Sequence, residues 1–269
     1  MIIKQFEDQN LSHYSYAIID SDKMAVIDPA RDPQPYYDFA AENDAAITAV
    51  IETHPHADFV SSHLEIHQAT GAEIYSSKLL GAKYPQHPFD EGQFFSLGKL
   101  KFTAWNTPGH SPDSITVILQ NDKGKDIAAF TGDTLFIGDC GRPDLREKAG
   151  NIHQNREELA SQMFHSLKKF HTLNDEVIVY PAHGSGSLCG KNISSESSNT
   201  IGREKEYNWC LQPMEEHEFL KALLDEQPFI PKYFGYNVEQ NVKGSLSYFE
   251  SIAKVNIGGF LKKDHHSLY

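Results

Sequence analysis

The chain has 269 residues, of which 39% are hydrophobic and 23% charged, so it can bury a large core and is globular in composition. Its 24 Lys and Arg against 37 Asp and Glu give a net charge of -13, which argues against nucleic-acid or membrane partners held by bulk electrostatics. The sequence shows neither a membrane-length apolar run nor a signal peptide, and its 3 cysteines are too few for a disulfide framework, so we expect a cytoplasmic protein.

The first half of the chain is predicted to alternate short strands with helices. In order, the expected elements are paired strands over 15–20 and 24–28, a helix from Asp32-Pro33, a strand over 46–52 and a helix over 61–70 ending at Gly71. The strand over 46–52 is nearly all apolar, which is typical of a strand covered on both faces.

The second half continues with further strands and then turns helical. The expected elements are strands within 94–107, 114–120 and 127–131, a helix beginning near Asn155, a strand over 176–181, a Gly- and Ser-rich loop over 182–198 and a short helix over 215–225. Beyond Pro228 the periodicity weakens, and we expect a tail that wraps over the surface.

Four short polar motifs each follow one of the predicted strands. They are His54-Pro55-His56-Ala57-Asp58, Pro108-Gly109-His110-Ser111, Thr131-Gly132-Asp133-Thr134 and Pro181-Ala182-His183-Gly184. In layered α/β folds, ligands bind at the carboxyl ends of strands, so these distant segments are expected to meet there. Imidazole together with carboxylate is a donor set for a first-row transition metal and does not suit calcium.

The order HxHxD, PGH, TGD and PAHG resembles the metallo-β-lactamase superfamily over about residues 12–210. The resemblance implies an α/β fold, an αββα four-layer sandwich of two mixed β-sheets flanked by helices. We therefore expect a catalytic domain over 1–210 and a helical or irregular extension over 211–269 packed on it. The superfamily's usual first motif is HxHxDH, whereas Phe59 stands here in place of the final histidine. A phenylalanine cannot bind a metal, so a mononuclear site is favoured.

Two histidines and one carboxylate form the facial triad of non-haem Fe(II) oxygenases. Within the superfamily, this arrangement resembles the persulfide dioxygenases. The resemblance implies one Fe(II) per chain held by His54, His110 and Asp133, with zinc as an adventitious occupant. The implied reaction is oxidation of a small thiol persulfide, on glutathione or another carrier, by O2 to sulfite and free thiol, as in sulfide detoxification. His56, Asp58 and His183 would orient the ligands, or would be remnants of a two-metal scaffold.

The segments Phe130 to Leu145 and Gly186 to Lys205 resemble the persulfide dioxygenase–rhodanese fusion proteins, although too few residues follow for a complete rhodanese domain. A separate sulfurtransferase partner and a homo-oligomer are therefore expectations.

Five other residues are candidates for contact with the substrate. Arg142 is expected to bind a carboxylate of the carrier thiol, unless it pairs with Asp144 or Asp139 instead. Tyr180, Arg203 and Lys205 are further substrate-binding candidates, with a core residue and a solvated helix face as the alternatives. Cys189, in a segment with nearby glycines, is a candidate for an exposed thiol that accepts sulfur, with a small buried apolar residue as the alternative.

Two other functions compete with the dioxygenase. One is a dinuclear thioester hydrolase resembling glyoxalase II, which would need Asp58 and His183 as ligands despite Phe59. The other is a non-catalytic sulfur sensor or carrier acting through Cys189 alone. His63 and His67, four residues apart on a predicted helix, are interpreted as surface histidines rather than a metal pair.

Overall fold

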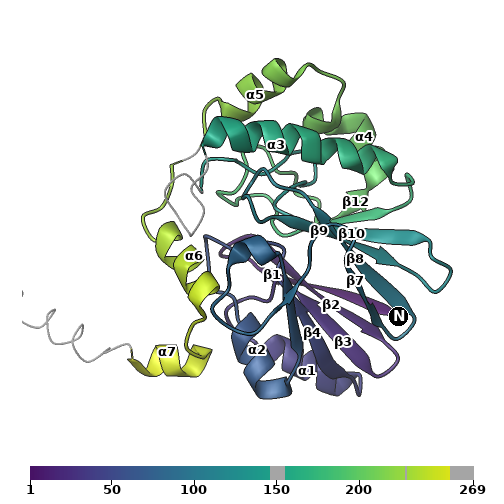
Figure 1. The fold of residues 1–269 in the computed structure, drawn as a ribbon, viewed down its shortest axis with the longest axis vertical. Helices are drawn as coiled ribbons and strands as arrows, with labels where there is room; N and C mark the ends of the chain where they lie inside the picture. The colour runs from purple at the N-terminus through teal and green to yellow at the C-terminus, as the bar shows by residue number, and fades with distance from the viewer. Residues whose placement is uncertain (146–154, 228, 255–269) are drawn as a thin grey trace, which may run out of the picture.

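Two mixed sheets of six strands each pack face to face in the computed structural model, which describes residues 1–145, 155–227 and 229–254 (Figure 1). The first sheet consists, in spatial order, of β1 (Ile2–Asp8), β2 (His13–Asp20), β3 (Lys23–Ile27), β4 (Ala46–Ile51), β5 (Glu73–Ser76) and β6 (His87–Pro88). β1, β2 and β3 pair antiparallel, and the pairs from β3 to β6 are parallel.

The second sheet consists of β12 (Asn199–Thr200), β11 (Ile178–Pro181), β10 (Asp126–Gly132), β9 (Ile115–Gln120), β8 (Leu100–Asn106) and β7 (Phe94–Leu97). Only the β10–β11 pair is parallel. Both sheets are therefore mixed, as the sequence predicted.

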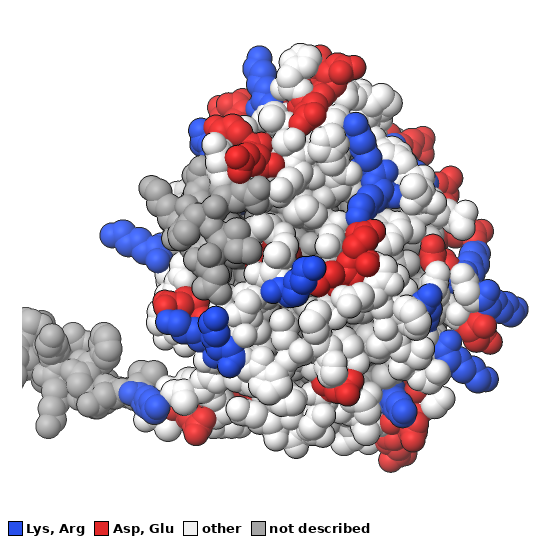
Figure 2. Space-filling model, in the orientation of Figure 1, with Lys and Arg blue, Asp and Glu red and all other residues white. Residues whose placement is uncertain are grey.

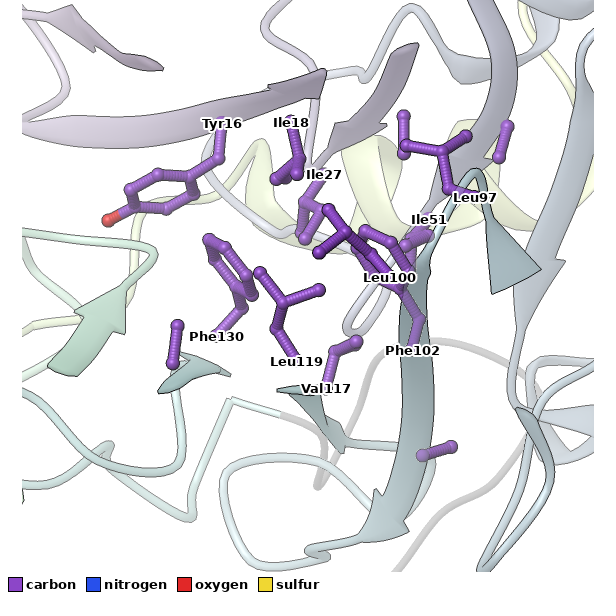
Figure 3. Close-up of a cluster of buried hydrophobic side chains, with 14 of the residues drawn as sticks. Tyr16, Ile18, Ile27, Ile51, Leu97, Leu100, Phe102, Val117, Leu119 and Phe130 are labelled. Atoms are coloured by element: carbon purple, nitrogen blue, oxygen red, sulfur yellow. The ribbon is translucent and has the colours of Figure 1, made fainter. Parts of the chain in front are cut away.

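The main core fills the space between the two sheets (Figure 3). Ile18, Ile27 and Ile51 of the first sheet point toward Leu119 and Phe130 of the second. Alternate residues of each strand face this layer because successive side chains in a strand point to opposite faces. The burial of both faces of β4 explains why residues 46–51 are nearly all apolar.

Helices cover the two outer faces of the sandwich (Figure 1). α1 (Gln34–Glu42) and α2 (His63–Thr70) pack on the first sheet, and α3 (Arg156–Lys168), α4 (Ile201–Tyr207) and α5 (Glu216–Leu224) on the second. α2 ends at Gly71, as predicted, because this glycine adopts the left-handed conformation with φ of 76°. In the described part of the chain, short 3-10 helices lie at Lys78–Leu80, Lys169–Thr172 and Trp209–Leu211.

The C-terminal part is more regular than the sequence suggested. Where we expected a tail without clear elements, the structure has α6 (Phe234–Lys243) and α7 (Tyr248–Lys254), and the expected extension ends outside the described residues. Strands β1, β5, β6 and β12 were also not predicted. None of the described helices is both long and apolar enough to cross a membrane. Figure 2 shows acidic and basic side chains interspersed over the visible face.

Candidate metal centre

The four polar motifs meet at one edge of the sandwich. The first follows β4 in one sheet, and the other three follow β8, β10 and β11 in the second. Main-chain hydrogen bonds join the sheets at this edge, from Ile115 N to Thr53 O (2.8 Å) and from Tyr14 N to Ala182 O (2.7 Å). The carboxyl ends of strands thus bring residues 54 and 183 into one site, as expected for this layer architecture.

His54, His110 and Asp133 form the first cluster of potential metal donors. Their side chains are buried, and the two Nε2 atoms lie 3.7 Å and 3.4 Å from Asp133 Oδ2. These separations are too long for hydrogen bonds. The 3.4 Å separation lies within the roughly 3–3.5 Å expected between neighbouring ligands whose bonds to one ion are about 2.1 Å, and the 3.7 Å separation lies just above it.

Hydrogen bonds behind the two imidazoles set their tautomers. His110 Nδ1 lies 2.9 Å from the carbonyl oxygen of Arg142, which only accepts, so Nδ1 carries the proton. The Thr53 hydroxyl donates to Asp28 (2.8 Å) and therefore accepts from Nδ1 of His54 (3.0 Å). Both Nε2 lone pairs are left to face Asp133, which is the orientation that second-sphere bonds impose on metal ligands.

The charge states also suit a metal. Burial lowers the pKa of His110 and takes that of His54 well below its usual value, so both rings are neutral. Burial alone would raise the pKa of Asp133, but the interactions with the neighbouring imidazoles, foremost His183, which also hydrogen-bonds the carboxylate, outweigh it and hold that pKa well below its usual range. Asp133 Oδ2 is buried and has no hydrogen-bond partner among the described residues. Two neutral imidazoles and an unpaired carboxylate oxygen are deprotonated donors, so the donor set fits a transition-metal ion.

The second cluster, His56, Asp58 and His183, adjoins the first. His183 lies between two carboxylates, with Nδ1 2.7 Å from Asp133 Oδ1 and Nε2 2.8 Å from Asp58 Oδ2. Burial would lower the pKa of His183, but Asp133 and Asp58 outweigh it and raise that pKa well above its usual value. Both ring nitrogens of His183 are therefore engaged by carboxylates, and one of these bonds holds the proposed ligand Asp133.

Phe59 packs its ring beside the second cluster. The ring centroid of Phe59 lies 4.5 Å from that of His56 and 4.2 Å from that of His13. His13 was not predicted from the sequence: it opens β2 outside any motif, is buried, and forms an isolated bridge with His183. The aromatic ring therefore packs against two histidines without offering a donor atom.

Glycine at 141 allows the segment after β10 to approach the first cluster. A Cβ at this position would lie 1.9 Å from the carbonyl oxygen of Asp133 and 3.0 Å from His110 Nδ1. Because such contacts are impossible, the glycine of the Gly-Arg-Pro-Asp segment is needed for the Arg142 carbonyl to reach His110.

The expected substrate-binding role of Arg142 is contradicted by its burial. The side chain is 1% exposed, and Nε and an Nη donate to the two carboxylate oxygens of Asp144 at 2.7 Å each. A third donor bonds the carbonyl oxygen of Leu188 (3.2 Å). The guanidinium thus ties residues 142–144 to the 188 loop, which is the structural alternative considered above.

The structure also favours the structural alternatives for Tyr180, Arg203 and Lys205. Tyr180 is half-buried against the inter-sheet core, stacked on Phe130 at 5.3 Å between centroids. On α4, Lys205 Nζ donates to Leu173 O and Asp175, whereas the guanidinium of Arg203 lies over the ring of Tyr207. In the described part of the chain, none of the three side chains has a hydrogen bond or ion pair to the two clusters.

Cys189 is buried, which contradicts the expectation of an exposed thiol. The side chain packs in a small apolar cluster with Phe136 and Phe234, and its sulfur lies near Asp133 and His183. Burial, with added repulsion from Asp133 and Asp58, raises the pKa of the thiol well above its usual value. The protonated thiol is a poor nucleophile.

We therefore expect the native protein to react slowly with a thiol-specific reagent such as Ellman's reagent at pH 8. All 3 cysteines are buried, so unfolding in guanidinium should release all of them for rapid reaction. Absorbance at 412 nm measures both rates. A burst of one thiol per native chain would restore the exposed-thiol interpretation.

His63 is also buried, which contradicts its interpretation as a surface histidine. Its Nδ1 lies 3.6 Å from Glu52, whereas the partly buried His67 bonds Ala72 O at 2.7 Å. Burial, with the charges of His56 and His67, lowers the pKa of His63 to about 3.

This pKa predicts an acid-sensitive contribution to stability. Between pH 6.5 and about 3 the unfolded state binds a proton that folded His63 does not. Stability should therefore fall as the pH drops through this window, by up to ~1.4 kcal/mol per pH unit. His63→Leu should flatten the dependence of the unfolding free energy on pH, measured by urea denaturation between pH 7 and 5. The exposed His165, replaced by Leu, is the matched control, and equal slopes in both variants would contradict the assignment.

The fold and the clustered donors define a class, the metal-binding enzymes built on an αββα sandwich. A model of the metallo-β-lactamase superfamily matches residues 9–183. The chain belongs to this superfamily.

Comparisons with single proteins point to two activities. Among solved structures, a metallo-β-lactamase of Staphylococcus aureus subsp. aureus COL superposes with a TM-score of 0.83 at 34% identity, over 91% of this chain and 73% of the other. ETHE1 from Myxococcus xanthus superposes with a TM-score of 0.75 at 30% identity, over 90% of this chain and 98% of the other. The mitochondrial persulfide dioxygenase ETHE1 of Bos taurus is 28% identical over 205 residues, 73% of each chain.

The hydroxyacylglutathione hydrolase of Francisella tularensis subsp. novicida is 27% identical over 183 residues, 68% of this chain and 67% of the relative. The resemblance to the persulfide dioxygenase branch is confirmed at this modest identity. These comparisons do not distinguish the two reactions, because the hydrolase matches as closely as the persulfide dioxygenase.

Proposed function

We propose that this protein is a mononuclear Fe(II) persulfide dioxygenase, which oxidises a low-molecular-weight thiol persulfide to sulfite and the free thiol. The observation that supports it most is the convergence of His54, His110 and Asp133 on one point, beside a second cluster whose His183 and Asp58 bond each other. Two imidazoles and one carboxylate with open positions are the ligand set of non-haem iron oxygenases.

The chain's own residues would prepare the centre in three ways. His54 and His110 present Nε2 because Thr53 and the Arg142 carbonyl hold their Nδ1 protons. Asp133 offers Oδ2 because His183 binds Oδ1. The buried position of all three excludes bulk water from the donor atoms.

Bound iron would supply the one-electron chemistry that lets a persulfide react with triplet O2. The overall reaction balances as RSS⁻ + O2 + H2O giving RSH, SO3²⁻ and H⁺. The outer sulfur is oxidised to sulfite and O2 is the oxidant. The S–S bond breaks, and the inner sulfur leaves as the carrier thiol.

The test is anaerobic reconstitution with Fe(II), followed by oxygen-electrode and sulfite measurements with persulfides of glutathione, coenzyme A and cysteine. The proposal expects oxygen uptake and sulfite in a one-to-one ratio. Persulfide-dependent turnover without oxygen uptake would contradict it.

The alternative is a thioester hydrolase with two metal ions, favoured by the similarity to hydroxyacylglutathione hydrolase and by the proximity of His56, Asp58 and His183. It predicts about two ions per chain, the arrangement of bridged two-metal hydrolases. Cleavage of S-lactoylglutathione by zinc-loaded protein in the absence of air distinguishes the two functions.

A further inference from the structure

The loop that carries the first motif lacks main-chain support of its own. Within the described chain, residues 54–60 form no hydrogen bond between two main-chain groups. The loop nevertheless supplies His54, His56 and Asp58, whose donor atoms must be held within a fraction of an ångström to bind a metal. Its shape therefore has to be fixed by side chains from elsewhere.

Two buried asparagines of α6 provide these bonds. Asn241 Nδ2 donates to the carbonyl oxygens of His56 (2.8 Å) and Phe59 (2.9 Å), and its Oδ1 accepts from the main-chain N–H of Ser61 (2.9 Å). Asn237 Nδ2 donates to the carbonyl oxygen of Ala57 (3.0 Å). The amide of Asn241 has two donor hydrogens and one acceptor oxygen facing the loop, and all three are used.

The orientation of the Asn241 amide follows from its partners. If nitrogen and oxygen were exchanged, the oxygen would face two carbonyl oxygens and the nitrogen would face the N–H of Ser61. Aspartate is nearly the same size but accepts only, so it would keep the bond from Ser61 and lose the other two. The site thus requires an asparagine.

α6 is itself fixed in place against the sandwich. Asn237 and Asn241 are four residues apart and share one face of the helix with Phe234 and Val238, which pack in the cluster that contains Ala57 and Cys189. At its end, Tyr84 donates to the carbonyl oxygen of Asn241 (2.9 Å). Figure 1 shows α6 lying alongside the sandwich rather than over either outer helical layer.

We propose that Asn241, with Asn237, is a positioning residue of the metal centre: α6 holds the His54–Ser61 loop in its metal-binding shape. The catalytic unit therefore continues beyond residue 210, through α6. This inference rests on the metal centre proposed above, but not on the identity of the substrate. The asparagines act through the loop and do not bind the metal themselves.

The test measures metal affinity and stability separately. Asn241→Asp and Asn237→Leu are compared with Val242→Ala, which removes buried volume from the same helix without touching the hydrogen bonds to the loop. Competition with a chromophoric chelator gives the Zn(II) dissociation constant. Thermal unfolding with and without Zn(II) gives the stabilisation that the metal adds.

We expect the two asparagine variants to bind Zn(II) about 10–100-fold more weakly, the range found when groups that orient ligands are removed. The rise in Tm on adding Zn(II) should shrink in both, because a ligand stabilises the folded state according to its affinity. In Val242→Ala, the Tm should fall while the Zn(II) affinity stays that of the wild type.

A purely structural role predicts a different pattern. The asparagine variants would then lose the same Tm with and without Zn(II), and their dissociation constants would match the wild type, which would overturn the inference. If Asn241→Asp does not fold, the same measurements on Asn237→Leu, which loses a single hydrogen bond to the loop, decide between the two roles. Wild-type protein that binds Zn(II) tightly but has no persulfide activity would contradict the proposed function and leave this inference standing.

Discussion

Replacing His110 by alanine is expected to abolish persulfide-dependent oxygen uptake. The substitution removes one of the two imidazoles that face Asp133, and it removes the Nδ1 bond to the carbonyl oxygen of Arg142. One imidazole and one carboxylate are a poor site for a divalent ion. Since loss of a group that merely orients a ligand costs about 10–100-fold, loss of the ligand itself should exceed that range. The oxygen electrode and the iron content of the purified variant measure both effects.

The matched control is His165→Ala, which removes an exposed histidine on α3 and should leave oxygen uptake unchanged. Cys189→Ser distinguishes the dioxygenase from the rival sulfur carrier, in which the Cys189 thiol acts alone. A carrier predicts that Cys189→Ser loses function and His110→Ala keeps it. That pattern would rule out the metal centre as the site of chemistry.

Asp28→Ala is expected to have the largest effect on stability. The carboxylate accepts hydrogen bonds from Thr53 N (2.7 Å) and Thr53 Oγ1 (2.8 Å), and Oδ1 lies 3.3 Å from Nε2 of His56. Asp28 is 1% exposed, so its loss leaves buried donors without an acceptor. We expect the free energy of unfolding to fall by about 3–5 kcal/mol. Metal content should fall as well, because the Thr53 hydroxyl would no longer be committed to Asp28 and could donate to His54.

Urea denaturation of the metal-free protein measures the stability effect, and Asp22→Ala in the exposed β2–β3 turn is the control. The control should change stability by no more than about 0.5 kcal/mol. A loss below about 1 kcal/mol in Asp28→Ala would mean that the buried carboxylate is not the acceptor on which the loop depends.

The architecture and the convergence of the four motifs were predictable because each rests on a local signal. Apolar runs of strand length preceded every motif, and the carboxyl ends of strands share one edge. The sequence therefore indicated that the four motifs meet, and the resemblance to the persulfide dioxygenases selected His54, His110 and Asp133 among their residues. The sequence could not indicate Asp28 or His13. Asp28 reaches Thr53 only because β3 pairs with β4, and His13 reaches His56 only because β2 pairs beside β3.

The differences at Arg142 and His63 share one cause. Charged and imidazole side chains are interpreted from sequence by their average exposure, whereas tertiary packing buried both. Arg142 is buried because Asp144, two residues on, neutralises it. The glycines around Cys189 suggested an open loop, but α6 packs over it through Phe234. α6 itself carried a signal, since its buried residues recur at spacings of three and four. Asn237 and Asn241 belong to this buried set, and because both are polar, the apolar periodicity of the helix was not recognisable from the sequence.

The most direct test of the account counts iron and oxygen together. Protein reconstituted anaerobically with Fe(II) should contain about one iron per chain, since the second cluster's His183 and Asp58 are bound to each other and Phe59 offers no donor. On admission of air and a persulfide, one O2 should disappear for each sulfite formed. About two ions per chain, with thioester cleavage that proceeds equally without air, would contradict the account.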